Sequence, residues 1–134
     1  MTVGGPSKFW VIPADIYEPL RREFLFDYDP CPFPRPEGFD GLTAGWGKNN
    51  WVNPLFGQGI TAWVRKAIAE QEKGKTSVVI LPLDNWVKLF MDAGAEIRVV
   101  GKHRWINQET GESRPSSRPS FLFILRPKQE SATT

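Results

Sequence analysis

The sequence predicts a three-layer α/β protein, in which helices cover both faces of a mostly parallel sheet. Residues 77–81 read Ser-Val-Val-Ile-Leu, a run typical of a strand that is buried on both faces. Residues 58–73 have the spacing of a helix with one buried face, formed by Ile60, Trp63, Val64, Ala67 and Ile68. Because strand-like and helix-like stretches alternate along 134 residues, we expect a single domain of this kind.

The first predicted elements are a helix and two short strands. A proline and an acid in the first turn favour a helix that starts at Pro13, and Pro19 should kink or shorten it. Residues 24–28 form the first predicted strand, which ends at Asp29-Pro30-Cys31. A long ordered loop, whose aromatic side chains argue against disorder, then leads to a second strand at residues 50–53.

The second half of the chain continues the alternation. Gly74 ends the helix at residues 58–73, and Asp84 or Asn85 is expected to cap the helix that closes at Gly94. Residues 95–100 and 120–125 are predicted strands, and the polar stretch 107–119 is predicted to be a mobile loop. We expect residues 1–9 to form a flexible arm, residues 10–126 the folded domain and residues 127–134 a polar tail.

Charge is distributed unevenly along the chain. The formal net charge is +2, but residues 98–128 hold seven Lys and Arg against two Glu, a net of +5. Within this stretch we predict a nucleic-acid-binding patch that consists of Lys102, His103, Arg104, Trp105, Arg114 and Arg118. A solvated loop is the alternative interpretation of the same residues.

Cysteine and histidine occur once each, as Cys31 and His103. A single cysteine rules out an internal disulfide and fits a reducing cytoplasm, and the two residues are too few for a zinc-finger type of metal site. No apolar run reaches membrane-spanning length, and residues 1–9 lack a signal-peptide core. These observations favour a cytoplasmic protein with no metal and no membrane partner.

The most informative stretch is Asn53-Pro54-Leu55-Phe56, at the end of the predicted second strand. Asn-Pro initiates a turn, and α/β sheets bind ligands at the carboxyl ends of their strands. Taken alone, such a dipeptide is more often an ordinary turn than a catalytic one. The stretch therefore predicts a site only together with the order of its neighbours.

A set of short motifs follows in a fixed order along the chain. It consists of Pro13 before a helix, Asp29-Pro30-Cys31, Asp40-Gly41-Leu42, Trp46, Asn53-Pro54, Trp63-Val64-Arg65-Lys66-Ala67, Val78 to Pro82, Ala95-Glu96-Ile97-Arg98, Gly101-Lys102 and Pro119-Ser120-Phe121. This order resembles the phage-type DNA N-6-adenine methyltransferase (phage Dam) family. The resemblance covers residues 10–125 and implies a reduced, Rossmann-like methyltransferase fold. It also implies transfer of a methyl group from S-adenosylmethionine to the exocyclic amine of adenine in DNA.

The resemblance implies roles for particular residues. The family's catalytic tetrapeptide maps onto Asn53, Pro54 and Phe56. The amide oxygen and the proline carbonyl would accept hydrogen bonds from the adenine amine, and the ring would stack on the flipped base. The cofactor-binding residues would be Asp29, which accepts from the ammonium of the methionine part, together with Pro30, Cys31, Phe39 and Asp40.

Leu55 stands where the family tetrapeptide has a second proline. This departure leaves open a degenerate relative that binds nucleic acid or cofactor without turnover. The basic patch and the many rings leave open a single-stranded nucleic-acid-binding protein of another class. The residues also do not separate DNA from RNA as the substrate, or a monomer from a homodimer.

Overall fold

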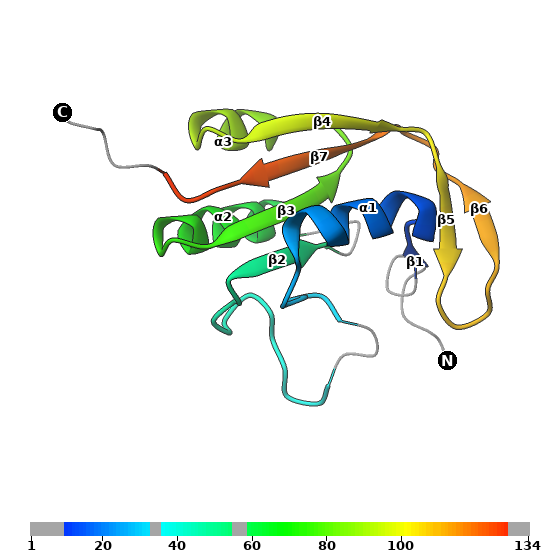
Figure 1. Cartoon of the computed structure of the whole chain (residues 1–134), viewed down its shortest axis with the longest axis horizontal. Helices are drawn as coiled ribbons and strands as arrows, with labels where there is room; N and C mark the ends of the chain where they lie inside the picture. The colour runs from blue at the N-terminus through cyan, green and yellow to red at the C-terminus, as the bar shows by residue number, and fades with distance from the viewer. Residues whose placement is uncertain (1–9, 33–35, 55–58, 129–134) are drawn as a thin grey trace.

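The computed structural model describes residues 10–32, 36–54 and 59–128, to which the statements below refer (Figure 1). The predicted arm, most of the predicted tail, Leu55 and the predicted catalytic Phe56 lie outside these ranges. The helices are α1 (Ala14–Phe24), α2 (Ile60–Glu72) and α3 (Val87–Asp92). The strands are β1 (Trp10–Val11), β2 (Asn49–Val52), β3 (Thr76–Leu81), β4 (Glu96–Gly101), β5 (Arg104–Asn107), β6 (Ser113–Pro115) and β7 (Ser120–Leu125).

The strands form two sheets, with the orders β2-β3-β7-β4 and β1-β5-β6. β2 and β3 are parallel, but the other four strand pairs are antiparallel. The prediction of a mostly parallel, Rossmann-like three-layer fold is therefore wrong, and the described chain is a mixed α/β structure. The error has a physical cause, because an apolar run shows that a strand is buried but not which way it runs. β7 is as buried as β3, yet it lies between β3 and β4 in the opposite direction.

Three local predictions also need correction. Residues 24–28 are not a strand, because α1 continues to Phe24 and Leu25 then adopts a left-handed conformation with φ of 53°. Residues 107–119 are not a loop throughout, since β6 pairs with β5 in a hairpin. Trp86, rather than Asp84 or Asn85, occupies the N-cap position of α3. By contrast, the helix predicted at 58–73 and the strands predicted at 77–81, 95–100 and 120–125 are confirmed within two residues.

Alternate residues of the large sheet face two separate cores, as the period of a strand requires. On one face, α1 buries Leu20 and Phe24 against a cluster that includes Trp51 and Val78. On the other face, α2 and α3 pack against a second cluster, where the rings of Phe90 and Phe123 stack at 4.3 Å. Helices therefore lie on both sides of the sheet (Figure 1). Within the described ranges, no helix has the length and apolar composition needed to cross a membrane.

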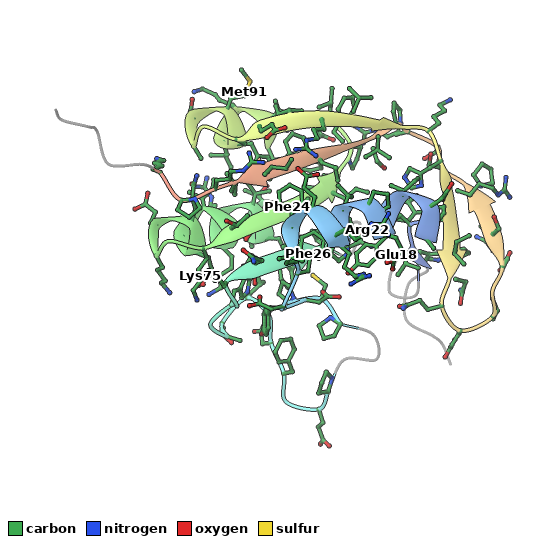
Figure 2. All side chains as sticks on the ribbon, in the orientation of Figure 1. Glu18, Arg22, Phe24, Phe26, Lys75 and Met91 are labelled. Carbon is green, nitrogen blue, oxygen red and sulfur yellow. The ribbon has the colours of Figure 1, made fainter. Side chains whose placement is uncertain are left out.

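A buried carboxylate joins α2 to the loop that precedes β2. Glu70 is fully buried and pairs with Lys66 at 2.8 Å, Lys73 at 3.2 Å and Lys75 at 2.8 Å, and it accepts the N–H of Trp46 at 3.3 Å. Burial alone would raise the pKa of Glu70, but these donors outweigh it and lower the pKa to about 2. Lys75, which lies where β2 and β3 begin (Figure 2), also donates to the Trp46 carbonyl at 2.6 Å. The cluster therefore anchors the loop that leads into β2.

We expect Glu70→Gln to destabilise the protein and to flatten its acid sensitivity. A carboxyl with a lowered folded-state pKa contributes stability above its unfolded-state pKa, and the contribution is lost as pH falls from about 4.5 toward 2. A shift of this size corresponds to roughly 3 kcal/mol. Urea unfolding across this pH range is the measurement, with exposed Glu72→Gln on the same helix as the control. Equal unfolding midpoints for the two variants at neutral pH would show that the cluster contributes nothing.

Candidate functional site

Three parallel chain segments finish side by side at the same end of the large sheet, which we call its carboxyl edge. Tyr28 forms an isolated parallel bridge with Asn50, the second residue of β2. β2 is in turn parallel to β3. Asp29, Asn53 and Pro82 follow these three segments, so they lie along the same edge. It is the edge at which α/β sheets bind ligands.

A cavity of about 410 Å³ opens at this edge, between the sheet, β5 and the start of α1. Asp29 supplies the charged group of its lining, and Trp51 and Tyr17 supply aromatic walls that meet edge-on at 5.3 Å. Trp51 is only 6% exposed, so it belongs to the core and also lines the cavity. Among the described residues, the lining consists of Val11, Ile12, Pro13, Ala14, Tyr17, Asp29, Trp51, Ile106 and Gln108.

The Asp29 carboxylate can be reached from solvent, yet the surrounding protein partly desolvates it. Its side chain reaches solvent through the cavity, but the surrounding protein desolvates the carboxylate and raises its pKa. The N–H of Cys31 donates to Asp29 Oδ1 at 2.8 Å and opposes this shift in part. The carboxylate is therefore held in one orientation at the cavity, with an environment that favours a cationic partner.

Cys31 connects this turn to Asn53. Burial raises the pKa of the Cys31 thiol, the charge of Asp29 adds to the effect, and a hydrogen bond with the Asn53 backbone opposes it. The Asn53 side chain points toward β1, where Nδ2 donates to the Trp10 carbonyl at 3.3 Å. Because a carbonyl can only accept, this bond turns Nδ2 toward β1 and leaves Oδ1 directed away from it. Pro54, the next predicted site residue, is buried.

The structure places the other predicted cofactor residues differently. Pro30 is buried, and its carbonyl lies so close to Gly41 that a side chain at Gly41 would collide with it. Asp40 is therefore near the Asp29 turn, but its Oδ1 accepts the N–H of Leu42 at 2.9 Å in a local turn. Neither Asp40 nor Phe39 belongs to the cavity lining, whose rings are those of Tyr17 and Trp51.

The predicted basic patch divides into engaged and open side chains. Arg104 bonds to Ser113, while Arg114 pairs with Glu112 at 3.1 Å and lies over the Trp10 ring at 5.1 Å. Arg118 contacts the Leu83 carbonyl and lies 3.6 Å from the Asp84 carboxylate. Lys102 is exposed.

The two rings of the patch are partly buried. His103 Nδ1 lies 2.9 Å from the Arg104 carbonyl and Nε2 lies 2.8 Å from Ser120 Oγ, so both ring nitrogens are engaged. The Trp105 ring packs edge-on to His103 at 4.6 Å and against the α1 core. Arg104, Trp105 and Arg114 thus lie on the β5–β6 hairpin, while Lys102 and His103 precede it and Arg118 follows it. The rings of His103 and Trp105 are part of the local packing.

Several cavity residues were not among the sequence predictions. Pro13 is the N-cap of α1 and Tyr17 lies in α1, for which the sequence predicted a helix but no part of the site; Ile106 and Gln108 come from β5 and the turn after it. The pairing of β1 with β5 brings these two regions together, and no local pattern reports that pairing. In the part of the chain that the structure describes, no group of three His, Cys, Asp or Glu side chains could hold a metal ion.

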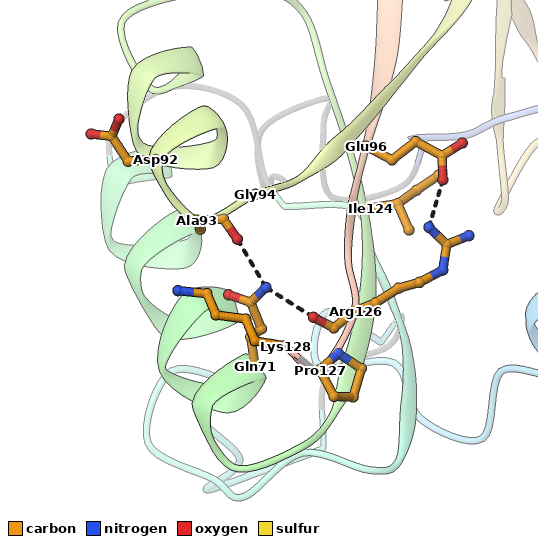
Figure 3. Close-up of a pocket in the computed structure, with 9 residues that line it drawn as sticks. All are labelled: Gln71, Asp92, Ala93, Gly94, Glu96, Ile124, Arg126, Pro127 and Lys128. Carbon is orange, nitrogen blue, oxygen red and sulfur yellow. Dashed lines mark hydrogen bonds and ion pairs between the residues drawn. The ribbon is translucent and has the colours of Figure 1, made fainter. Parts of the chain in front are cut away.

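A further cavity of about 340 Å³ lies at the opposite edge of the sheet (Figure 3). Here Gln71 Nε2 donates to the Ala93 carbonyl at 3.1 Å and to the Arg126 carbonyl at 2.9 Å. These bonds tie α2 to the ends of α3 and β7 (Figure 3). The Gln71 side chain therefore has a structural role. Unlike the first cavity, this one does not lie at the carboxyl ends of the parallel strands β2 and β3.

The chain belongs to the DNA N-6-adenine-methyltransferase (Dam) family, whose family model matches residues 5–134. No curated protein and no solved structure matches the chain. The family resemblance identified from the sequence is thus confirmed over nearly the whole chain.

The close approach of Gly41 to the Asp29 turn is testable. A methyl group at Gly41 would clash with the Pro30 carbonyl and lie 2.8 Å from the Trp63 ring, so Gly41→Ala should destabilise the protein by about 1–3 kcal/mol. Gly45→Ala is the matched control, because a methyl group there meets nothing within 4 Å. Urea unfolding measures both variants. Equal midpoints would show that the loop does not pack on the Asp29 turn in this way.

Proposed function

We propose that this chain transfers a methyl group from S-adenosylmethionine to the exocyclic N-6 amine of adenine in DNA. Membership in the family supports a DNA adenine methyltransferase in general terms. The observation that supports the finer assignment is that the Asp29 turn contacts Asn53: Asp29 lines the cavity, and Cys31, whose N–H donates to Asp29, is hydrogen-bonded to the Asn53 backbone. Asn53 is not part of the described cavity lining, but the resemblance assigns these two neighbouring segments to different parts of one reaction.

The cavity has the chemistry that this cofactor requires. Its volume of about 410 Å³ falls within the range of roughly 300–1,000 Å³ for small-molecule sites. The Asp29 carboxylate suits the ammonium of the amino-acid part. The first N–H groups of α1 have no side-chain cap and suit its carboxylate. The rings of Tyr17 and Trp51 suit the adenine.

The role of Asn53 follows from its bond to β1. With Nδ2 held by the Trp10 carbonyl, Oδ1 would accept a hydrogen bond from the target amine, and the Pro54 carbonyl would accept the second. These two acceptors orient the nitrogen lone pair, so that catalysis is mainly positioning. When bound, S-adenosylmethionine would supply an electrophilic methyl group, toward which Asn53 and Pro54 would hold the amine, and its sulfonium would leave as the neutral thioether. The amine then loses its proton to water, so no strong base is needed near Asn53.

The rest of the site serves the nucleic acid. In this proposal Phe56, which the structure does not describe, stacks on the flipped adenine, as the family resemblance implies. The exposed cations Lys102, which precedes β5, and Arg104, which lies on it, contact phosphates. DNA, the substrate of the family, is the partner we propose, and the cytoplasm is the compartment in which this protein would meet it.

The two acceptors that hold the amine, Asn53 Oδ1 and the Pro54 carbonyl, form what we call the Asn53 clamp. Its removal distinguishes an enzyme from a protein that binds substrate without turnover. Wild type should transfer tritiated methyl groups to an adenine-containing duplex, and Asn53→Ala should lower kcat by about 100-fold or more. Asn53→Asp should lower kcat by about tenfold, because a carboxylate cannot donate to the Trp10 carbonyl. Equal incorporation by wild type and Asn53→Ala would remove Asn53 from the catalytic site. No incorporation by wild type would exclude the activity.

Cofactor binding tests Asp29. Calorimetry with S-adenosylmethionine should show about tenfold weaker binding for Asp29→Asn, since one charge-assisted contact is lost. The wild-type affinity should fall as pH drops through the raised pKa of Asp29, because only the ionised carboxylate accepts from the ammonium. The variant should lack this dependence, and Asp92→Asn at the opposite edge should behave as wild type. An unchanged affinity for Asp29→Asn would contradict the assignment.

A further inference from the structure

A small cavity of about 140 Å³ lies on the other side of β5 from the proposed cofactor cavity. Successive residues of a strand point in opposite directions, and here Ile106 lines the cofactor cavity while Trp105 lines the small one. β5 is therefore the wall between the two cavities. The small cavity is lined by Pro82, Trp105, Ser116, Ser117, Arg118 and Ser120.

The register of the sheet places this cavity next to the Asn53 turn. Val52 lies opposite Val79, so Asn53 follows at the level of Ile80 and Pro82 is two residues further on. Strand spacing and rise then put the Cα atoms of Asn53 and Pro82 about 8 Å apart. The distance is on the scale of a single nucleotide, so a strand held at Asn53 would pass the mouth of the small cavity.

The lining suits an anion. It contains three hydroxyls and one guanidinium, and no carboxylate belongs to it among the described residues. Ser116 Oγ accepts the N–H of His103 at 3.1 Å, so its own O–H remains available as a donor. Ser116 and Ser120 are 8% and 3% exposed, and burial of this kind fixes the geometry of hydroxyls before a ligand arrives. Arg118, at the mouth, adds the charge and the fork of donors that phosphates favour.

We propose that this cavity binds a backbone phosphate of the substrate strand beside the target adenosine. The inference rests on the proposed function, because the substrate strand is placed by the Asn53 clamp. Ser116, Ser117 and Arg118 donate to the phosphate oxygens. Trp105 forms the apolar wall against the sugar. The contact fixes the register of the strand relative to the clamp but reads no base.

Asp84 restrains this site. Its carboxylate lies 3.6 Å from the Arg118 guanidinium, which also donates to the Leu83 carbonyl. The pairing holds the guanidinium at the cavity mouth, but it competes with an incoming phosphate for the same charge. Removal of the Asp84 charge should therefore strengthen phosphate binding, an effect that misfolding cannot imitate.

Fluorescence anisotropy with a short adenine-containing duplex at several salt concentrations tests the proposal. Arg118→Gln should weaken binding about tenfold and reduce the slope of log affinity against log salt by about one. Asp84→Asn should tighten binding several-fold. Arg65→Gln, an exposed arginine on α2 across the sheet, should bind as wild type. If Arg118→Gln and Asp84→Asn both match Arg65→Gln, the cavity is not a phosphate site.

A scan with uncharged methylphosphonate linkages locates the contact. For wild type, one linkage near the target adenine should cost about tenfold in affinity, and for Arg118→Gln the same linkage should cost little more. Equal sensitivity of the two proteins at every linkage would overturn the proposal. Methyl incorporation keeps the two hypotheses apart. If wild type methylates DNA and Arg118→Gln binds DNA as wild type does, the phosphate site is rejected and the proposed activity stands. If the variants show the expected binding pattern but wild type does not methylate DNA, the proposed activity is rejected and the phosphate site stands.

Discussion

The parallel alignment of β2 with β3 is the constraint on which the site depends, and a buried amide secures it. Asn50 is fully buried, and its Oδ1 accepts the N–H of Gly47 at 2.9 Å. Its Nδ2 donates to the carbonyls of Gly47 at 3.1 Å and Thr76 at 3.0 Å, and to Ser77 Oγ at 3.3 Å. Every polar atom of the side chain is thus matched to one strand register, because a slip would leave a buried amide unsatisfied. That register places Asn53 at the carboxyl edge.

A buried carboxyl group, that of Glu70, and a solvent-exposed one, that of Asp29, show how surroundings separate a structural role from a binding role. Glu70 meets three lysines and a backbone N–H, so its charge is compensated within the protein. Asp29 is desolvated with no cation among the described residues of the cavity lining, and its pKa is raised rather than lowered. A carboxylate in the second situation gains most from a cationic ligand. The contrast is the electrostatic reason to assign ligand binding to Asp29 and stability to Glu70.

The small sheet of β1, β5 and β6 turns a strand edge into an enclosed site. β1 supplies the carbonyl that orients Asn53, and β5 separates the proposed cofactor cavity from the proposed phosphate cavity. The two strands are about a hundred residues apart in the chain, and they pair with Trp10 opposite Asn107. Positioning of the clamp and separation of the ligands therefore come from the same pairing.

The sequence by itself determined the family, the helix at residues 58–73, the buried strands at residues 77–81 and 120–125, and the end of a strand just before Asn53. These features are local, because hydrophobic periodicity and the proline and glycine residues that end helices and strands act over a few residues. Tertiary structure decided the direction of β7, the pairing of β1 with β5, and therefore which side chains line the cavity. Strand direction and long-range pairing depend on which surfaces meet, and a buried strand has the same apolar pattern in either direction. For this reason Tyr17 and Gln108 could be assigned to the site only from the folded chain.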